Sequence, residues 1–205
     1  MNPKKIHKNI RRFCHRYRLV LMVSLVMVLV FTVAILIPEA VEHQKGTGDY
    51  SAFLDALGKR ESSNNYAAVN RFGYMGRYQM GGMALKEAGF KDADGAWTAL
   101  ANSYGVYSQD DFLHSPDAQN VAVAAYHTKV CSYIRAYRLE RYIGSTYCGV
   151  EVTRSGLLAA CHLVGVGSLK KALASGTHAY DGNRTPASEY MKKFGGYDIS
   201  EVWGE

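Results

Sequence analysis

A single carboxylate, Glu61, opens a stretch of the chain that is otherwise free of acids. Residues 58–80 read GKRESSNNYAAVNRFGYMGRYQM, and the next acidic residue is Glu87. The stretch is rich in Ser, Asn, Tyr, Gly and Gln, which hydrogen-bond to sugars or stack on them. What one carboxylate can do in such surroundings depends on where the chain places it.

The position of Glu61 favours a proton donor. It follows Leu57 by four residues, so both side chains lie on one face of a helix expected over residues 49–62. Partial burial on that face and the negative end of the helix dipole both disfavour the ionised form, so we expect Glu61 to keep its proton near neutral pH. Such an acid can protonate a leaving glycosidic oxygen. The alternative is a solvent-exposed ion pair with Lys59 or Arg60.

Helical periodicity dominates the chain beyond this segment, and residues 62–81, which lack it, should form loops or a short hairpin. We therefore expect a mainly α fold, a compact domain with little sheet. The predicted helices cover residues 49–62, 82–89, 115–137, 153–176 and 185–194. The expected caps and breaks are Asp49 or Ser51, Gly89, Ser115 with Pro116, Gly165 and Gly167, and Thr185 with Pro186.

The positive charge is concentrated at the start of the chain. Of the 24 Lys and Arg among 205 residues, seven lie in residues 1–18; the other 17 lie in residues 39–205 with all 18 Asp and Glu. The second part therefore carries a formal charge of −1, and the overall +6 belongs to the tail. We expect no nucleic-acid partner for the domain.

Residues 19–37, LVLMVSLVMVLVFTVAILI, form an uncharged apolar run that Pro38 and Glu39 close. As a helix the run is roughly 28 Å long, about the thickness of a hydrocarbon core. It is too long for a cleavable signal peptide, and no convincing cleavage site follows. We expect a single-pass anchor in the inner membrane and, by the positive-inside rule, a periplasmic domain. The expected parts are a basic cytoplasmic tail (1–18), a transmembrane helix (19–37), a linker (38–49) and a catalytic domain (50–205).

Cys14 falls on the expected cytoplasmic side, whereas Cys131, Cys148 and Cys161 fall in an oxidising compartment that allows one disulfide. The sequence does not fix the pair; we favour Cys131–Cys148, with burial as small apolar side chains as the alternative. The cysteine spacings match no zinc motif, and the glycines near residue 76 do not follow a strand as in a phosphate loop. We expect no metal and no cofactor.

Four blocks, in order, resemble the lytic transglycosylase and goose-type lysozyme family. Glu61-Ser62 followed by GYMGRYQM resembles the family's Glu-Ser and the Gly-x-x-Gly turn after it. SPDAQNVAVAAYH, GLLAACHLVGVGSLKKAL and TPASEYMKKF resemble three further family segments. GKRESS, GYMGRYQMG, SGLLAACHLVG and EYMKKF are more similar to a branch of lysozyme-like domains seen in phage and secretion-associated proteins. The match covers about residues 50–200 and implies a lysozyme-like fold.

The resemblance implies a role for each matched residue. Glu61 is expected to be the general acid/base of a peptidoglycan-cleaving enzyme, with Ser62 orienting it or touching substrate. Gln79 is expected to hydrogen-bond an N-acetyl or hydroxyl group, between Tyr78 and Met80, which shape the cleft wall. Further positions that align near the family's cleft are Tyr126, His162 and Tyr190.

The chain departs from the family in one block. Cys161-His162 stand where the family usually has Tyr-Asn, whose side chains support the catalytic Glu and bind sugar. His162 can take over the hydrogen bonding and can titrate, or it is a satisfied core histidine. For Tyr126 and Tyr190, core packing is the alternative.

The lack of an acid in residues 62–86 favours chemistry with one carboxylate. Most glycosidases pair a proton donor with a second carboxylate, but the next acids are expected in structural roles. The resemblance then implies a lytic transglycosylase: Glu61 protonates the bond leaving N-acetylmuramic acid, then deprotonates its 6-hydroxyl, giving a 1,6-anhydro end. A water-using muramidase is the alternative. The acids given structural roles are Asp92, Asp94, Asp110 and Asp111.

The expected partners are peptidoglycan glycan strands, the membrane through the N-terminal helix, and proteins of an envelope or secretion apparatus. A non-catalytic module that binds glycan or scaffolds such an apparatus is the competing interpretation, because of the change at Cys161 and His162. A third is a phage endolysin with a releasable anchor. Such anchors are weakly hydrophobic and rich in Gly and Ala, unlike residues 19–37.

Overall fold

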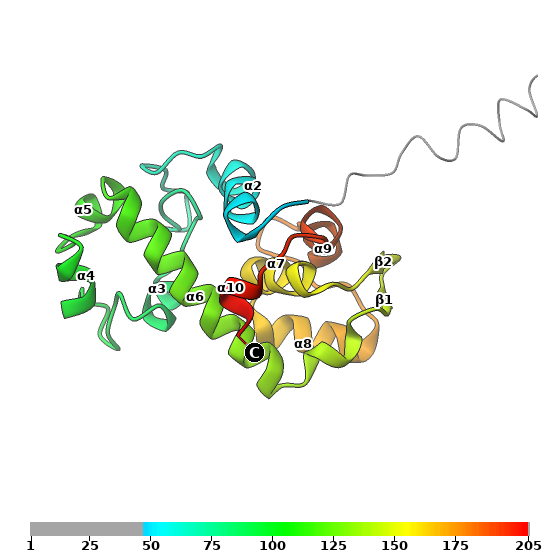
Figure 1. Ribbon diagram of the computed structural model, residues 1–205. Coiled ribbons are helices and arrows are strands. Elements are labelled where there is room, and N and C mark those ends of the chain that lie inside the picture. The colour runs from blue at the N-terminus through cyan, green and yellow to red at the C-terminus, as the bar shows by residue number, and fades with distance from the viewer. Residues whose placement is uncertain (1–46, 205) are drawn as a thin grey trace, which may run out of the picture. The chain divides into compact units, whose positions relative to one another are not determined.

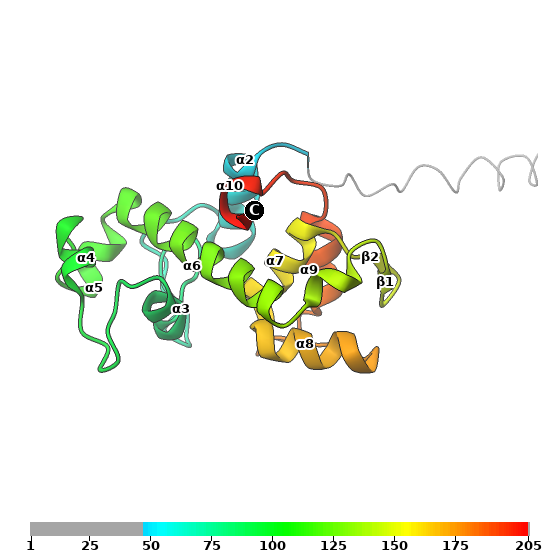
Figure 2. The same cartoon turned by 60° about the horizontal axis from the view of Figure 1, so that its bottom comes forward.

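Helix α6 (Pro116–Ala136) is the central element of the computed structural model, which describes residues 47–204. The Ser115 hydroxyl accepts a hydrogen bond from the Ala118 N–H and Pro116 is the first helical residue, so the predicted start is confirmed. Figures 1 and 2 show two groups of shorter helices along α6. The first holds α3 (Gly82–Glu87), α4 (Ala99–Ser103) and α5 (Gln109–Leu113), and the second α7 (Arg154–Val164), α8 (Val166–Ser175) and α9 (Ala187–Phe194).

The described residues are mainly helical, which confirms the expected fold class at that level. The predicted tail (1–18), transmembrane helix (19–37) and most of the linker (38–49) lie outside the described residues. Within residues 47–204, no helix taken alone is both long and apolar enough to cross a membrane. Helices α7 and α8 pass the same test of length and composition only as a pair, bent by 116°.

Helix α2 (Tyr50–Ser62) carries Glu61 in its last turn, as predicted. Of the two cap candidates, Asp49 is the cap, because its carboxylate accepts from the Ala52 N–H at 3.0 Å. The buried face of α2 includes Phe53 and Leu57, which are fully enclosed. This packing fixes the direction in which the end of α2 points.

Helices α7 and α9 approach each other closely. A Cβ atom at Gly156 of α7 would stand 3.1 Å from the Met191 carbonyl oxygen of α9, and one at Gly195, at the end of α9, would stand 3.1 Å from the hydroxyl oxygen of Thr153, the cap of α7. Helix α7 ends at Gly165, which has a φ of 76°, so the predicted break there is confirmed. The second predicted break is wrong, because Gly167 lies inside α8, which already restarts at Val166.

The prediction of Thr185 as the cap of the last helix is also wrong. Helix α9 begins at Ala187 after Pro186, with no side-chain cap. The Thr185 N–H instead donates to the Asp181 carboxylate at 2.6 Å, so Thr185 belongs to the preceding turn. That turn forms one wall of the cleft described below.

Residues 63–81 form loops held by the isolated bridges Val69–Met75 and Met75–Met80, as predicted for this stretch. Short elements that the periodicity did not indicate are α4, α5, the 3-10 helix η1 (Leu139–Tyr142), the antiparallel pair β1 (Thr146–Tyr147) and β2 (Val150–Glu151), and α10 (Ser200–Trp203). Each has at most five residues, too few for a helical or strand period to be recognised.

The favoured Cys131–Cys148 disulfide is wrong. Cys131, Cys148 and Cys161 are free thiols. Cys131 is buried in α6 and Cys161 in α7, whereas Cys148 lies in the turn between β1 and β2. Burial raises the pKa of the Cys131 thiol to about 12, so this group behaves as a small apolar side chain.

Candidate active site

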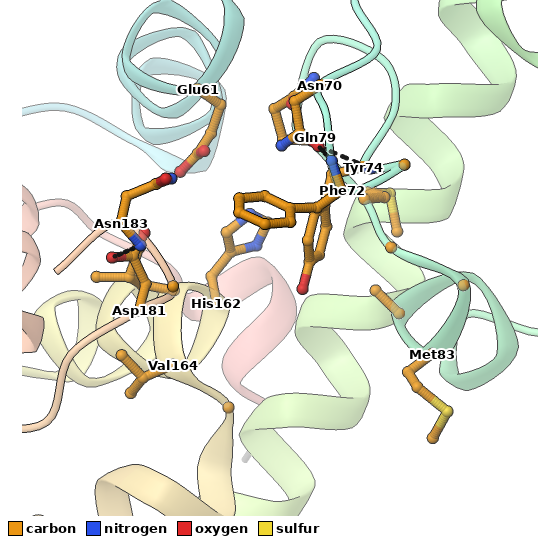
Figure 3. A pocket seen from close by; sticks show the side chains of 18 of the residues that line it. Glu61, Asn70, Phe72, Tyr74, Gln79, Met83, His162, Val164, Asp181 and Asn183 are labelled. Carbon is orange, nitrogen blue, oxygen red and sulfur yellow. Dashed lines mark hydrogen bonds between the residues drawn. The ribbon is translucent and has the colours of Figure 1, made fainter. Parts of the chain in front are cut away.

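A cleft with a volume of about 730 Å³ opens beside the end of α2. Its lining comes from residues 70, 72–74, 79–84, 162–165 and 180–183, together with Glu61 and Tyr126. In Figure 3, Glu61 reaches into the cleft from α2, with Asn183 and Asp181 nearby; Asn70, Phe72, Gln79 and Tyr74 lie across from them. Three segments that are distant in the sequence therefore meet around Glu61.

Glu61 is held by Tyr190 of α9. The Tyr190 hydroxyl donates to Glu61 Oε1 at 2.6 Å, and Tyr190 itself is only 3 % exposed. Burial, and then the charge of Glu61, raise the pKa of Tyr190, so the phenol remains a donor. Arg60, the alternative partner of Glu61, instead pairs with Glu189 at 3.0 Å. Tyr190 thus fixes the orientation of a half-buried acid.

Ser62 does not line the cleft but fastens its wall. The Ser62 hydroxyl donates to the Arg77 carbonyl oxygen at 2.8 Å and accepts from the Asn65 N–H at 3.0 Å. The Arg77 guanidinium also reaches back to α2 and pairs with Asp55. The turn that follows the candidate acid is therefore tied to the helix that carries it.

Gln79 and Met80 line the cleft, whereas Tyr78 lies behind it. Tyr78 is 1 % exposed and its hydroxyl donates to the Asn120 side chain at 2.7 Å. Gln79 has a φ of 48°, a conformation that costs a non-glycine residue energy and is concentrated at functional sites. Its side-chain amide donates to the Gly76 carbonyl oxygen at 3.0 Å, which holds it at the cleft wall.

Tyr126 and His162 also line the cleft, with ring centroids 5.9 Å apart. Both nitrogens of His162 already have protein partners: Nδ1 lies 3.1 Å from His127 Nε2, and Nε2 lies 3.1 Å from the Tyr78 carbonyl oxygen. Burial lowers the pKa of His162, while Glu61 and the Tyr78 carbonyl oppose that effect. Sugar binding by His162 stays a prediction. Because both ring nitrogens already have partners within the protein, a sugar could contact only the carbon atoms of the ring.

Asp181 is a second carboxylate in the cleft, which the sequence analysis missed. Its Oδ1 accepts from the Asn183 N–H at 3.0 Å and from the Thr185 N–H at 2.6 Å. The Asp-Gly-Asn sequence signals a turn, but no local pattern connects it with Glu61, 120 positions earlier. Two of the acids expected in structural roles make local bonds: Asp92 accepts from the Asp94 N–H in a turn, and Asp111, in the first turn of α5, accepts from the hydroxyl of the cap residue Ser108.

Exposed apolar side chains also gather at the cleft. Phe72 is 53 % exposed, Tyr180 55 % and Met83 70 %, and all three line it. At its rim, Arg71 donates to Asn183 Oδ1 at 3.1 Å, which joins the two walls. Large apolar surfaces beside amide groups suit a ligand with both flat apolar faces and hydroxyl or amide edges.

Within residues 47–204, no three His, Cys, Asp or Glu side chains are placed to hold a metal ion. Searches for similar proteins found no matching family model, no matching curated protein and no matching solved structure.

Proposed function

We propose that the protein is a peptidoglycan-cleaving enzyme with Glu61 as its general acid/base. The observation that carries the proposal is the Glu61 carboxyl group, oriented by Tyr190 and directed into a cleft of about 730 Å³. A positioned acid with access to a ligand is what protonation of a glycosidic oxygen requires. The resemblance of residues 50–200 to the lytic transglycosylase and goose-type lysozyme family points to the same chemistry.

The cleft lining supports a glycan as the ligand. Asn70, Gln79 and Asn183 offer amide groups, and Phe72 and Tyr180 offer rings on which a sugar can stack. The lining residues, all of them in the described part of the chain, include no Lys or Arg, and the guanidinium of Arg71 at the rim already donates to Asn183. An uncharged chain of N-acetylated sugars fits these groups better than a nucleic acid does.

The proposed reaction is cleavage of the β-1,4 bond between N-acetylmuramic acid and N-acetylglucosamine. Glu61 donates its proton to the leaving glycosidic oxygen, while the substrate's own acetamido oxygen stabilises C1. Glu61 then accepts the proton of the muramyl 6-hydroxyl as that oxygen bonds to C1. The product is a 1,6-anhydro end formed without water, the outcome of a lytic transglycosylase.

Hydrolysis by a muramidase is the second candidate, and Asp181 is the observation that favours it. Residues 62–86 contain no acid, but folding brings Asp181 into the cleft that also contains Glu61. Two backbone N–H groups occupy Asp181 Oδ1, so its other oxygen would have to position water. We prefer the transglycosylase, because these two bonds account for Asp181 as the anchor of its turn.

Substitution of Asp181 by Asn separates the two reactions. The change keeps an oxygen that can accept both N–H groups but removes the base. We expect Asp181→Asn to retain activity within about threefold and to give the same anhydro ends, measured by mass spectrometry of released fragments. A loss of about a hundredfold or more would instead favour Asp181 as the base of a hydrolase.

The finer fold and the cellular setting are part of the proposal. We propose a lysozyme-like domain held at the inner membrane by residues 19–37, with the domain in the periplasm. Its action would open the wall locally for a secretion apparatus or related machinery. A non-catalytic glycan-binding module remains the alternative that experiment must exclude.

Digestion of purified sacculi by the full-length protein in detergent tests the proposal. We expect the wild type to reduce the turbidity of sacculi, and Glu61→Gln to lower the rate about a thousandfold. Glu140→Gln is the matched control, because Glu140 lies in η1 and outside the cleft lining. Glycan binding without any loss of turbidity would support the non-catalytic module.

A further inference from the structure

A chain of hydrogen bonds crosses the core and ends at the cleft wall. The Tyr50 hydroxyl lies 2.9 Å from His127 Nδ1, and His127 Nε2 lies 3.1 Å from His162 Nδ1. His162 Nε2 then lies 3.1 Å from the Tyr78 carbonyl oxygen. The chain joins α2, α6 and α7 to the turn that presents Gln79 and Met80 to the cleft.

The direction of every bond follows from its last acceptor. A carbonyl oxygen can only accept, so His162 Nε2 carries the hydrogen. The Nδ1 atom of a neutral His162 then accepts from His127 Nε2, and His127 Nδ1 in turn accepts from the Tyr50 hydroxyl. With both rings neutral, all four ring nitrogens are satisfied.

One added proton reverses two of these bonds. With a proton on His162 Nδ1, His127 Nε2 has to accept, and the hydrogen that it carried moves to His127 Nδ1, which then donates to the Tyr50 oxygen. Burial opposes the charge: His127 is fully buried, and burial followed by His162 lowers its pKa well below the ordinary value. Burial also lowers the pKa of His162.

The other titratable groups around these hydrogen bonds include two acids, Glu61 at the His162 end and Glu201 at the Tyr50 end, which are negative charges when ionised. Glu61 acts on His162 and favours its protonated form, and Tyr126 packs against both histidine rings. At the far end, Glu201 and the buried Cys131 act on Tyr50. Burial outweighs the effect of Glu61, because the pKa of His162 is lowered. The titratable groups that act on or pack against Tyr50, His127 and His162 are Glu61, Tyr78, Tyr126, Cys131 and Glu201.

We propose that His162 and His127 are positioning residues: as a neutral pair they hold the Tyr78 carbonyl and so place Gln79 and Met80 for the ligand. His162 thus acts through the turn of residues 76–80 and not by touching a sugar with its nitrogens. The φ of 48° at Gln79 is the kind of conformation that needs such outside support. The kinetic test described below rests on the proposed function, because it measures activity. The NMR tests do not depend on that function.

Nitrogen NMR of the histidine rings in the full-length protein tests the arrangement without any substrate. We expect both rings to be neutral Nε2–H tautomers at about pH 5.5, a pH unit below the ordinary pKa. A ring in the Nδ1–H tautomer, or either ring titrating near its ordinary pKa, would overturn the proposal.

Substitutions of His162 test positioning. His162→Gln keeps one donor and one acceptor, whereas His162→Phe keeps a ring but neither bond. We expect His162→Phe to raise the KM for a soluble glycan strand about tenfold and His162→Gln to raise it less than about threefold. A purely structural role would lower the amount of active enzyme and leave KM unchanged, which would refute the proposal.

The same variants give an answer if the wild type proves inactive. The backbone amide signals of residues 76–80 should shift in His162→Phe and remain near their wild-type positions in His162→Gln. His114→Phe should leave them in place. If His162→Phe left them in place as well, positioning would be refuted irrespective of the activity.

Discussion

At the scale of single residues, the central contact is the one between Glu61 and Tyr190. The two residues lie 129 positions apart, and the phenol reaches Oε1 at 2.6 Å. Tyr190 was expected to lie near the cleft, with core packing as the alternative; it is buried and also bonds Glu61. A carboxyl group that is already oriented loses less conformational entropy when a ligand binds than a mobile carboxyl group does.

Replacing Tyr190 by Phe tests this contact. The change removes the hydroxyl but keeps the ring that packs against Phe194. We expect the rate of sacculus digestion to fall about tenfold while the helical circular dichroism is unchanged. Tyr197→Phe, made in a ring that packs edge-on against Phe53, should leave the rate unchanged. Equal rates for both variants would mean that Glu61 needs no support from Tyr190.

At the scale of elements, α6 brings two buried polar side chains to the cleft wall. Gln119 accepts from the Arg77 N–H at 2.7 Å and donates to the Phe112 carbonyl oxygen at 2.8 Å, while His127 supports His162. Both residues face the core from α6. The turn after Glu61 is therefore held from behind as well as from α2.

The two neutral histidines make the stability of the domain depend on pH. Their pKa values are lowered in the folded state, so the unfolded chain binds more protons once the pH falls below about 6.5. Their contribution is fully present above that pH and is lost on acidification.

We expect the free energy of unfolding to fall between about pH 7 and pH 5.5, by up to about 1.4 kcal/mol per pH unit for each histidine. Urea titrations across this range measure it. The double variant His127→Gln/His162→Gln should show a clearly smaller slope than the wild type. An unchanged slope in the double variant would show that other groups cause the dependence.

The elements that the sequence predicted well are those whose signals are local. Ser115 and Pro116 mark the start of α6, and Asp49 and Gly165 mark ends of α2 and α7, because a cap or a left-handed glycine acts within a few residues. Thr185 misled because α9 begins at Ala187, so that Pro186 occupies the N-cap position and Thr185 closes the turn of Asp181. A shift of one residue at a helix start cannot be recognised from the helix pattern alone.

At the scale of the whole molecule, the cleft depends on packing that spans most of the described chain. The close approach of α7 and α9 at Gly156 and Met191 brings Tyr190 to Glu61 and places the turn of Asp181 opposite residues 70–79. Glu61 and Gln79 were identified from a short stretch and its resemblance. Asp181 was missed, because its place in the cleft is decided by contacts more than a hundred positions apart.

The most direct measurement of the central claim is mass spectrometry of the glycan ends released from sacculi in water enriched in heavy oxygen. We predict that the wild type releases fragments with unlabelled 1,6-anhydro ends and that Glu61→Gln releases none above the blank. Labelled reducing ends would keep Glu61 as the acid but assign the reaction to hydrolysis. Equal release by Glu61→Gln, or none by the wild type, would contradict the proposal that this cleft cleaves glycan.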